Sequence, residues 1–234
     1  MSSAIAAYRA PYRLLCILLG SCTLPLLLGA DAADTRPPCL FGTALGEDEQ
    51  PVGACPELDP LHLERNLQVR KLIAAINMSP QSISFAGCPG SVYAVQMHSD
   101  GRYVITYPPE IREGFIAPVA HEIAHIVQIQ AAGGLDQLQA RYRSRRVELG
   151  ADYLAGILFR RVLPEVSRNE FQNHVHLKGL YREPSLARAH GTPVQRTAAF
   201  RFGIVGKTEP VGATLAEASE HFQEDLYEKA VSFR

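Results

Sequence analysis

Residues 120–128, AHEIAHIVQ, place two histidines four positions apart, with a glutamate directly after the first histidine. On an α-helix, with about 100° of rotation per residue, His125 lies about 40° from His121, and Glu122 lies about 100° from it. The apolar residues of this stretch share the opposite side of the helix, between about 140° and 240°: Val119, Ile123, Ile126 and Val127. One face would therefore join a core, while the other carries the three polar groups.

This face has the chemistry of a metal site. Two imidazoles at positions i and i+4 can bind one ion, and a glutamate on the same side can act as a base, as a zinc hydrolase requires. The alternative interpretation is a solvated helix face with two surface histidines. The continuous apolar stripe on the opposite side argues against that alternative.

The third ligand decides the class of site. An extended motif, His-x-x-Gly-x-x-His after the glutamate, would need glycine and histidine where the chain has Gln128 and Ala131. Downstream, residues 145–156 (RRVELGADYLAG) place Glu148 and Asp152 four positions apart on one helix face. Glu148 can complete a His-His-Glu site for Zn²⁺ with water in the fourth position, and Asp152 can accept the ring N–H of a ligand histidine. Taken alone, the two carboxylates would be read as an exposed acidic pair, and only the nearby histidine motif favours the metal site.

Three segments together resemble the gluzincin branch of zinc metallopeptidases. They are AHEIAHIVQ, ELGADYLAG (148–156) and HGTPVQRTAAFRFG (190–203), and the resemblance extends over roughly residues 84–204. It is closest to the neutral zinc metallopeptidases of bacteria and looser to the HtpX-like peptidases. The resemblance implies a zincin-like α+β fold, a Zn²⁺ cofactor and a protein or peptide substrate.

The resemblance also implies roles for single residues. His121, His125 and Glu148 would be the zinc ligands, Glu122 the general base, and the segment at His190 would approach the active site. The chain departs from the family pattern at Ala124, where glycine is common, and at Gly150, where a larger polar residue is common. These departures concern the subfamily and the substrate more than the metal.

The segment after His190 predicts a well-defined helix start. Thr192 is a suitable N-cap, Pro193 suits the first helical position, and Gln195 can close a capping box. His190, held at this helix entrance, and Arg196 are candidates for stabilising an oxyanion during catalysis. The alternative is that His190 is a loop residue and that Arg196 makes a structural ion pair.

The N-terminus predicts export. Arg9 and Arg13 precede the apolar run 14–28, which ends in small residues, as in a secretory signal peptide of residues 1–32. We therefore expect a periplasmic or secreted protein, with an uncleaved or lipidated N-terminus at the membrane as the alternative. The mature chain keeps three cysteines, of which two are expected to pair in an oxidising compartment. Cys39 and Cys55 are nearest in sequence, which leaves Cys88 free or paired differently.

Composition and pattern predict one α+β domain. The chain has 234 residues and a net charge of −1, so no basic surplus suggests nucleic acid as a partner. After an irregular leader (33–58), the domain would span 59–234, with a small antiparallel sheet from short β-rich runs between 82 and 107. Asp100-Gly101 predicts a hairpin between the last two runs, and helices follow. An exposed strand of this hairpin could pair with an extended substrate.

These observations predict an exported zinc metallopeptidase. Structural zinc sites usually fill all four positions with protein ligands, whereas the sequence offers only three good candidates. The alternative is a non-catalytic, zinc-containing periplasmic protein that acts in binding, assembly or as a chaperone. The glutamate beside the first histidine argues against that alternative, since a protein that only holds its partner needs no base there.

Overall fold

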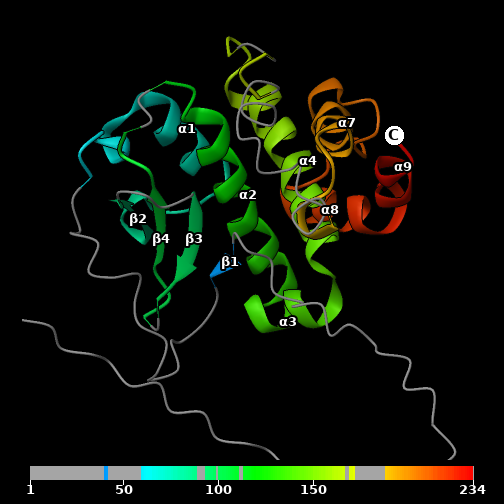
Figure 1. Ribbon diagram of the computed structural model, residues 1–234, viewed down its shortest axis with the longest axis horizontal. Coiled ribbons are helices and arrows are strands. Elements are labelled where there is room, and N and C mark those ends of the chain that lie inside the picture. The colour runs from blue at the N-terminus through cyan, green and yellow to red at the C-terminus, as the bar shows by residue number, and fades with distance from the viewer. Residues whose placement is uncertain are drawn as a thin grey trace, which may run out of the picture. The chain divides into compact units, whose positions relative to one another are not determined.

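The computed structural model describes residues 40–41, 59–88, 93–98, 100–110, 113–166, 169–171 and 188–233 (Figure 1). The predicted signal peptide (1–32) and nearly all of the leader (33–58) lie outside these residues. The described residues belong to one compact unit. Its described part combines a small sheet with a larger set of helices, which confirms the predicted α+β class. Within the described ranges, no helix has both the length and the apolar character needed to cross a membrane.

The sheet is mixed and not antiparallel as predicted. Its strands are β1 (Leu40–Phe41), β2 (Ile83–Gly87), β3 (Ala94–Met97) and β4 (Tyr103–Tyr107), in the order β1-β3-β4-β2. β3 and β4 form the predicted antiparallel hairpin, with Val95 opposite Ile105 and Gly101 at a positive φ of 81° in the turn. β2 lies beside β4 and runs parallel to it, and β1 runs parallel to β3. The prediction failed because β2 does not pair with the strand that follows it in the chain.

This strand order also bears on the expected substrate contact. Both strands of the hairpin are interior, since β3 is covered by β1 and β4 by β2. The edges of the described sheet belong to β1 and β2. β1 pairs with only two residues of β3, Val95 and Gln96, so pairing of the 91–107 hairpin with an extended substrate stays a prediction.

Several of the helices begin at a polar cap or end at a glycine. They are α1 (Leu67–Ala75), α2 (Ile116–Ala132), α3 (Leu135–Arg141), α4 (Ser144–Val162), α7 (Pro193–Val205), α8 (Leu215–His221) and α9 (Tyr227–Val231), with short 3₁₀ turns at Leu63–Arg65 and Pro80–Ser82. Gly133 ends α2 in the left-handed conformation, as the Gly-Gly pair predicts. The side chain of Asn66 caps α1 by accepting from the backbone N–H groups of Gln68 and Val69. The extended residue Tyr142 separates α3 from α4.

α2 is the centre of the unit. It contacts α1, β3 and β4 as well as α4 and α8. Figure 1 shows the sheet and α1 on one side of α2, with α4, α7, α8 and α9 on the other. Almost every residue of α2 is buried, including both histidines and the glutamate of the opening motif. The polar face of α2 therefore looks into the protein, towards the helices that follow, and not into solvent.

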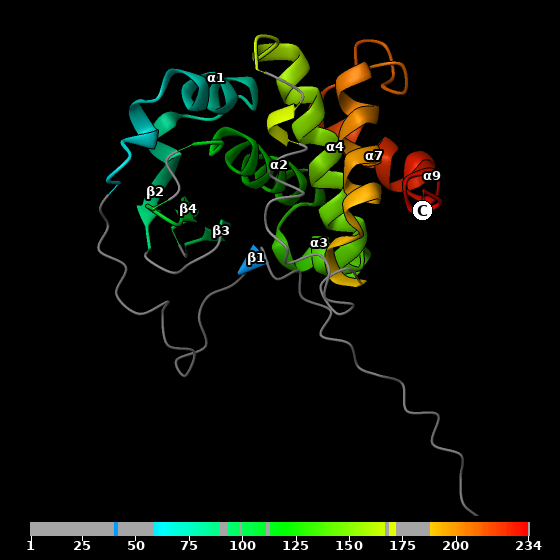
Figure 2. The same ribbon diagram turned by 45° about the horizontal axis from the view of Figure 1, so that its top comes forward.

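α4 and α7 lie side by side and approach closely at two glycines (Figure 2). A Cβ on Gly156 would lie 2.3 Å from the carbonyl oxygen of Phe200, and a Cβ on Gly203 would lie 2.1 Å from the carbonyl oxygen of Tyr153. Any side chain at either position would push the two backbones apart. This close approach brings the start of α7 to the face of α4 that carries Glu148 and Asp152.

The C-terminal helix contains a π-helical turn. α8, the π-turn η4 (Phe222–Leu226) and α9 follow one another without a break. Buried residues recur at every fourth position along this helix: Ala218, Phe222, Leu226 and Ala230. Gln223, in the π-turn, is also buried and donates to the carbonyl oxygen of Arg146 at 3.3 Å. The turn therefore places an amide against α4.

Cys88 is disulfide-bonded. The other cysteines of the chain lie outside the described residues. The predicted pairing of Cys39 with Cys55 would leave Cys88 without a cysteine partner in the mature chain. Cys39 and Cys55 lie outside the described residues, so their pairing stays a prediction.

Candidate metal centre

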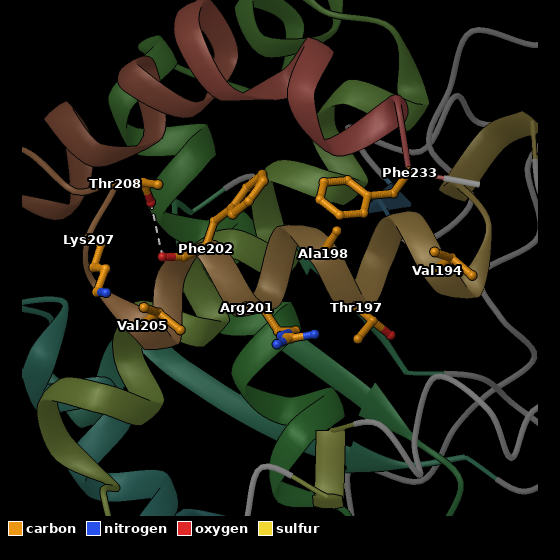
Figure 3. Close-up of a pocket in the computed structure, with 9 residues that line it drawn as sticks. All are labelled: Val194, Thr197, Ala198, Arg201, Phe202, Val205, Lys207, Thr208 and Phe233. Carbon is orange, nitrogen blue, oxygen red and sulfur yellow. Dashed lines mark hydrogen bonds between the residues drawn. The ribbon is translucent and has the colours of Figure 1, made fainter.

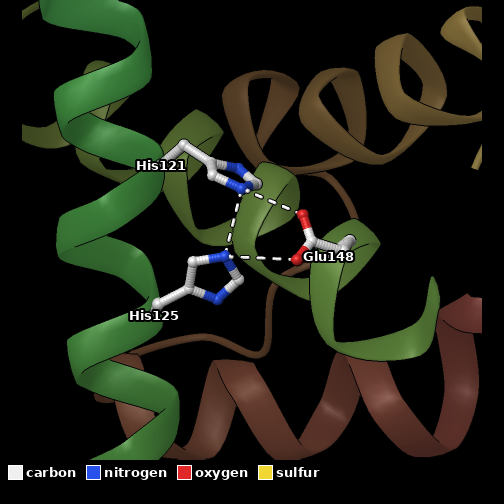
Figure 4. Close-up of side chains that lie close together, drawn as sticks. All are labelled: His121, His125 and Glu148. Carbon is white, nitrogen blue, oxygen red and sulfur yellow. Dashed lines mark hydrogen bonds and ion pairs between the residues drawn. The ribbon is translucent and has the colours of Figure 1, made fainter. Parts of the chain in front are cut away.

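Three side chains from two helices converge at one point. His121 and His125 project from α2, and Glu148 projects from α4 (Figure 4). The two Nε2 atoms lie 3.1 Å apart, and the Glu148 oxygens lie 3.3 Å from His121 Nε2 and 3.7 Å from His125 Nε2. One ligand atom from each residue lies within 4.8 Å of the other two. The predicted ligand set is thus brought together in a buried group that could hold a metal ion.

The hydrogen bonds behind the two imidazoles determine which nitrogen faces the centre. His121 Nδ1 donates to Asp152 Oδ1, and His125 Nδ1 donates to Gln128 Oε1, each at 2.9 Å. An ionised carboxylate and an amide oxygen can only accept, so both Nδ1 atoms carry a hydrogen. In their neutral forms the two rings therefore direct Nε2 lone pairs at each other. A cation between them would convert this repulsion into two bonds.

The spacing of the ligand atoms fits such a cation. Tetrahedral metal–ligand bonds of about 2.0–2.1 Å put neighbouring ligand atoms about 3.4 Å apart. The distances from His121 Nε2 to His125 Nε2 and to Glu148 Oε2, 3.1 and 3.3 Å, are close to that value. The distance from His125 Nε2 to Glu148 Oε1 is slightly longer, at 3.7 Å. Glu148 Oε1 is also a buried acceptor without a hydrogen-bond partner among the described residues. Coordination of a cation would satisfy it.

Asp152 lies directly behind His121, as predicted. Its carboxylate accepts from His121 and also from Arg196, whose Nε and Nη2 donate at 2.6 and 2.7 Å. Arg196 and Asp152 are almost completely buried, at 1% and 0% exposure. The structure thus places Arg196 in the ion pair considered as the alternative to an oxyanion role. Arg196 orients the carboxylate that orients His121.

His190 reaches the centre from the segment before α7, as the resemblance implied. Its Nδ1 lies 3.0 Å from Glu148 Oε2, and its side chain is buried. The capping box that we predicted at Thr192 and Gln195 is present, so the entrance of α7 is rigid where His190 precedes it. His190 therefore supports the carboxylate ligand in this structure, while its role towards an oxyanion stays a prediction.

Charges within the group separate the protonation of the two histidines. Burial alone would lower the pKa of His121, but the charge and hydrogen bond of Asp152 raise that pKa to about 9. Burial lowers the pKa of His125 to about 4. Burial would raise the pKa of Glu148, but the surrounding imidazoles, His190 foremost, hold it well below its usual range. In the metal-free protein at neutral pH, His121 therefore carries a hydrogen on both ring nitrogens, His125 is neutral with its hydrogen on Nδ1, and Glu148 is ionised.

Glu122 lies on the same helix, one residue after His121. Only 2% of its side chain is exposed, and it is not one of the three side chains that converge. Its role as general base stays a prediction. His190, at 5%, is the most exposed of the residues predicted for the site, so the whole group is shielded from water.

Sequence reasoning missed Gln128 as a member of the site. We used it only to exclude the extended histidine motif, yet it contacts His125 and is 1% exposed. Its position three residues after a ligand histidine, one helical turn away, is a signal that could have indicated this contact. The paired glycines Gly156 and Gly203 were also missed, although a glycine in a helix interior often marks a close approach.

A cavity of about 460 Å³ opens on the other face of α7 (Figure 3). Phe202 and Phe233 form apolar walls, and Arg201 and Lys207 are among the lining residues. On the helix, Arg201 lies about 140° from Arg196, so this cavity and the metal centre lie on different sides of α7. We assign it no part in the chemistry of the centre.

No protein-family model matches the chain, and no curated protein or solved structure matches it either.

Proposed function

We propose that the protein is an exported zinc-dependent peptidase of the gluzincin type, with a zincin-like fold. The observation that carries this proposal is the convergence of His121, His125 and Glu148 from α2 and α4, with Glu122 directly after the first ligand. Two imidazoles and one carboxylate form the donor set of several catalytic zinc sites, which leave a fourth position for water. Imidazole ligands favour Zn²⁺ at this site, whereas Ca²⁺ and Mg²⁺ prefer sites made of oxygen ligands alone.

The residues of the chain would divide the work of hydrolysis. Bound Zn²⁺ lowers the pKa of its water to about 7 and polarises a carbonyl group. Glu122 would accept the proton of the attacking water and deliver it to the leaving amine. Asp152 and Arg196 hold His121 with Nε2 towards the centre, and His190 holds the carboxylate of Glu148. These contacts would keep the ligands in place during the reaction.

The proposed substrate is a protein or peptide, and the proposed compartment is the periplasm or the exterior of the cell. The signal-like residues 1–32 support this location, with a membrane anchor or lipidation of the N-terminus as the only membrane contact proposed. The near-neutral net charge of −1 gives no support to a nucleic-acid substrate.

One observation favours a second candidate, a non-catalytic metal protein for binding or assembly. Both histidines, Glu122 and Glu148 are at most 3% exposed, so these side chains offer a peptide almost no accessible surface in this structure. A metal ion held there would join α2 to α4 and stabilise the fold without catalysis. Retention of a glutamate beside the first ligand favours the peptidase.

One experiment separates the two candidates. The purified mature chain is analysed for bound metal and incubated with casein and a peptide library, with and without a chelator. For a peptidase, we expect about one zinc per chain and hydrolysis that the chelator abolishes. Glu122→Gln should keep the metal and lose the activity, whereas His121→Ala should lose both.

The outcomes are unambiguous. Bound metal without hydrolysis in the wild type would favour the non-catalytic candidate. Undiminished hydrolysis in the Glu122→Gln variant would remove Glu122 from the mechanism. A wild-type chain that binds no divalent metal would contradict both candidates.

A further inference from the structure

The side chain of Gln128 is buried although it is polar at both ends. It lies on α2 at 1% exposure, where an amide without hydrogen bonds would cost stability. Both ends are bonded: Oε1 lies 2.9 Å from His125 Nδ1, and Nε2 lies 2.9 Å from the carbonyl oxygen of Val147. A carbonyl can only accept, so the amide nitrogen must face Val147 and the oxygen must face His125. The orientation of the amide is therefore determined.

This orientation determines the tautomer of His125. The amide oxygen accepts the hydrogen on Nδ1, which leaves Nε2 as a lone pair directed at His121 and Glu148. The other end of the amide is bonded to the residue that immediately precedes Glu148. One side chain thus connects the ligand on α2 to the backbone beside the ligand on α4.

Gly150 provides the space for this connection. A Cβ at Gly150 would lie 2.6 Å from Gln128 Nε2 and 2.5 Å from Gln223 Nε2. Gln223 comes from the π-turn and donates to the carbonyl oxygen of Arg146, one residue before Val147. Two buried amides therefore pack over the bare backbone of α4, and an added methyl group would displace one or both of them.

The two histidines are consequently supported in different ways. His121 is backed by an ionised carboxylate that Arg196 holds, whereas His125 is backed by a neutral amide. A neutral acceptor fixes the ring without adding a second negative charge behind the site. Glu148 and Asp152 already supply two ionised carboxylates to this buried group.

We infer that Gln128 is a positioning residue of the metal centre, which fixes the tautomer of His125 and the separation of α2 from α4, in a space that Gly150 leaves open. The inference deepens the proposed function and rests on its metal site, but not on peptide hydrolysis. Substitution of residues that hydrogen-bond to metal ligands typically weakens metal binding by about 10- to 100-fold.

The test uses the full mature chain and two readouts. Zn²⁺ affinity is measured by competition with a chromophoric chelator. The imidazole tautomers of the metal-free protein are read from long-range ¹H–¹⁵N spectra. Gln128→Met keeps the approximate length but removes both hydrogen bonds, and we expect affinity to fall about 10- to 100-fold and the Nδ1–H form of His125 to lose its dominance. Gln130→Met is the matched control, since Gln130 is exposed on the same helix, and should change neither readout.

Two further variants separate positioning from folding. Gln128→Glu keeps an oxygen that can accept from His125 but loses the donor to Val147, so it should restore the Nδ1–H form of His125 and only part of the affinity that Gln128→Met loses. Gly150→Ala keeps glutamine at position 128, and alanine favours the helix more than glycine does. A weaker Zn²⁺ affinity with unchanged helical content would therefore show that the added methyl group has displaced the amide of Gln128.

The inference is overturned if Gln128→Met binds Zn²⁺ within about twofold of the wild type, or if Gln130→Met loses as much. It is also overturned if His125 in the metal-free wild type does not carry its hydrogen on Nδ1. The spectra need no metal, so this failure is distinct from failure of the proposed function, which appears as a wild-type chain that binds no Zn²⁺.

Discussion

Replacement of Arg196 by methionine should destabilise the protein strongly, because it leaves a buried charge behind. Asp152 is 0% exposed and is held by two hydrogen bonds from Arg196, at 2.6 and 2.7 Å, and one from His121. Methionine fills much of the volume of arginine but donates nothing. The carboxylate would then keep its charge in a fully buried position, with His121 as its one remaining donor in the described contacts.

The size of the effect follows from these contacts. Hydrogen bonds to charged groups contribute about 1.5–3 kcal/mol each, so the loss of two suggests about 3–6 kcal/mol. Breaking a buried ion pair by removing one partner typically costs about 3–5 kcal/mol. His121, protonated in the metal-free protein, offsets part of the loss, so we expect about 3–4 kcal/mol. A typical domain has about 5–15 kcal/mol of stability in total, so this change is large.

Urea unfolding of the chelator-treated protein at pH 7 measures the loss. Arg201→Met is the control, since Arg201 is exposed on another face of α7 and should leave the midpoint unchanged. Adding Asp152→Leu to Arg196→Met removes the stranded charge and should recover part of the lost stability. Arg196 keeps the pKa of Asp152 below its usual value, against the effect of burial. The pair therefore stabilises the fold above the unfolded-state pKa and loses this effect as the pH falls through the folded-state pKa.

Two results would refute this reasoning. One is an Arg196→Met variant within about 1 kcal/mol of the wild type, which would mean that water or another donor reaches Asp152. The other is a double variant less stable than Arg196→Met alone, which would mean that the carboxylate is not the source of the loss.

Three further predictions concern protons, packing and capping. The pKa of His121 is raised to about 9 and that of His125 is lowered to about 4, so Zn²⁺ binding at pH 7 should release about one proton from these rings. Zn²⁺ affinity should also increase as the pH rises towards 9. Calorimetry in buffers of different ionisation enthalpy measures the released proton, and the absence of proton release would contradict the prediction. Gly156→Ala should lower the free energy of unfolding in urea by about 1–3 kcal/mol, because the added methyl group would push α4 and α7 apart, even though alanine favours a helix more than glycine does. An equal or higher stability would mean that the two helices can separate without cost. Thr192→Ala should cost about 1 kcal/mol and lower Tm, while Thr192→Ser should keep the cap; equal losses in both variants would remove the hydroxyl from the explanation.

The ligand set could be predicted because it depends on local geometry. Helical periodicity alone places His121 and His125 on one face and Glu148 and Asp152 on one face, and the apolar stripes indicate that both faces turn inward. The capping box at Thr192 is equally local, and it is present. Residues three or four positions apart on a helix lie on the same face, so for such features the sequence spacing directly predicts the contact.

The contacts of Arg196 and His190 could not be chosen from sequence. Both depend on how near α7 comes to α4, which is decided by the glycines at 156 and 203 and by backbone contacts between residues more than forty positions apart. The predicted antiparallel direction of β2 was wrong for a similar reason. A strand's own residues predict that it is extended, but its neighbour and direction depend on the path of the intervening chain.

The π-turn in the C-terminal helix has a consequence for how its two halves face the protein. In an ordinary α-helix, a row of residues spaced by four advances about 40° at each step, so Ala230 would stand about 120° round from Ala218. Both are buried here because the wider turn at 222–226 takes up that rotation. The helix is thus two segments set at a fixed angular offset by one inserted position. Deleting a single residue from the turn would give regular winding with eleven steps, about 20° in all, between the positions of Ala218 and Ala230, so α9 would keep its face towards α7; regular winding without a deletion would swing α9 by about 120°.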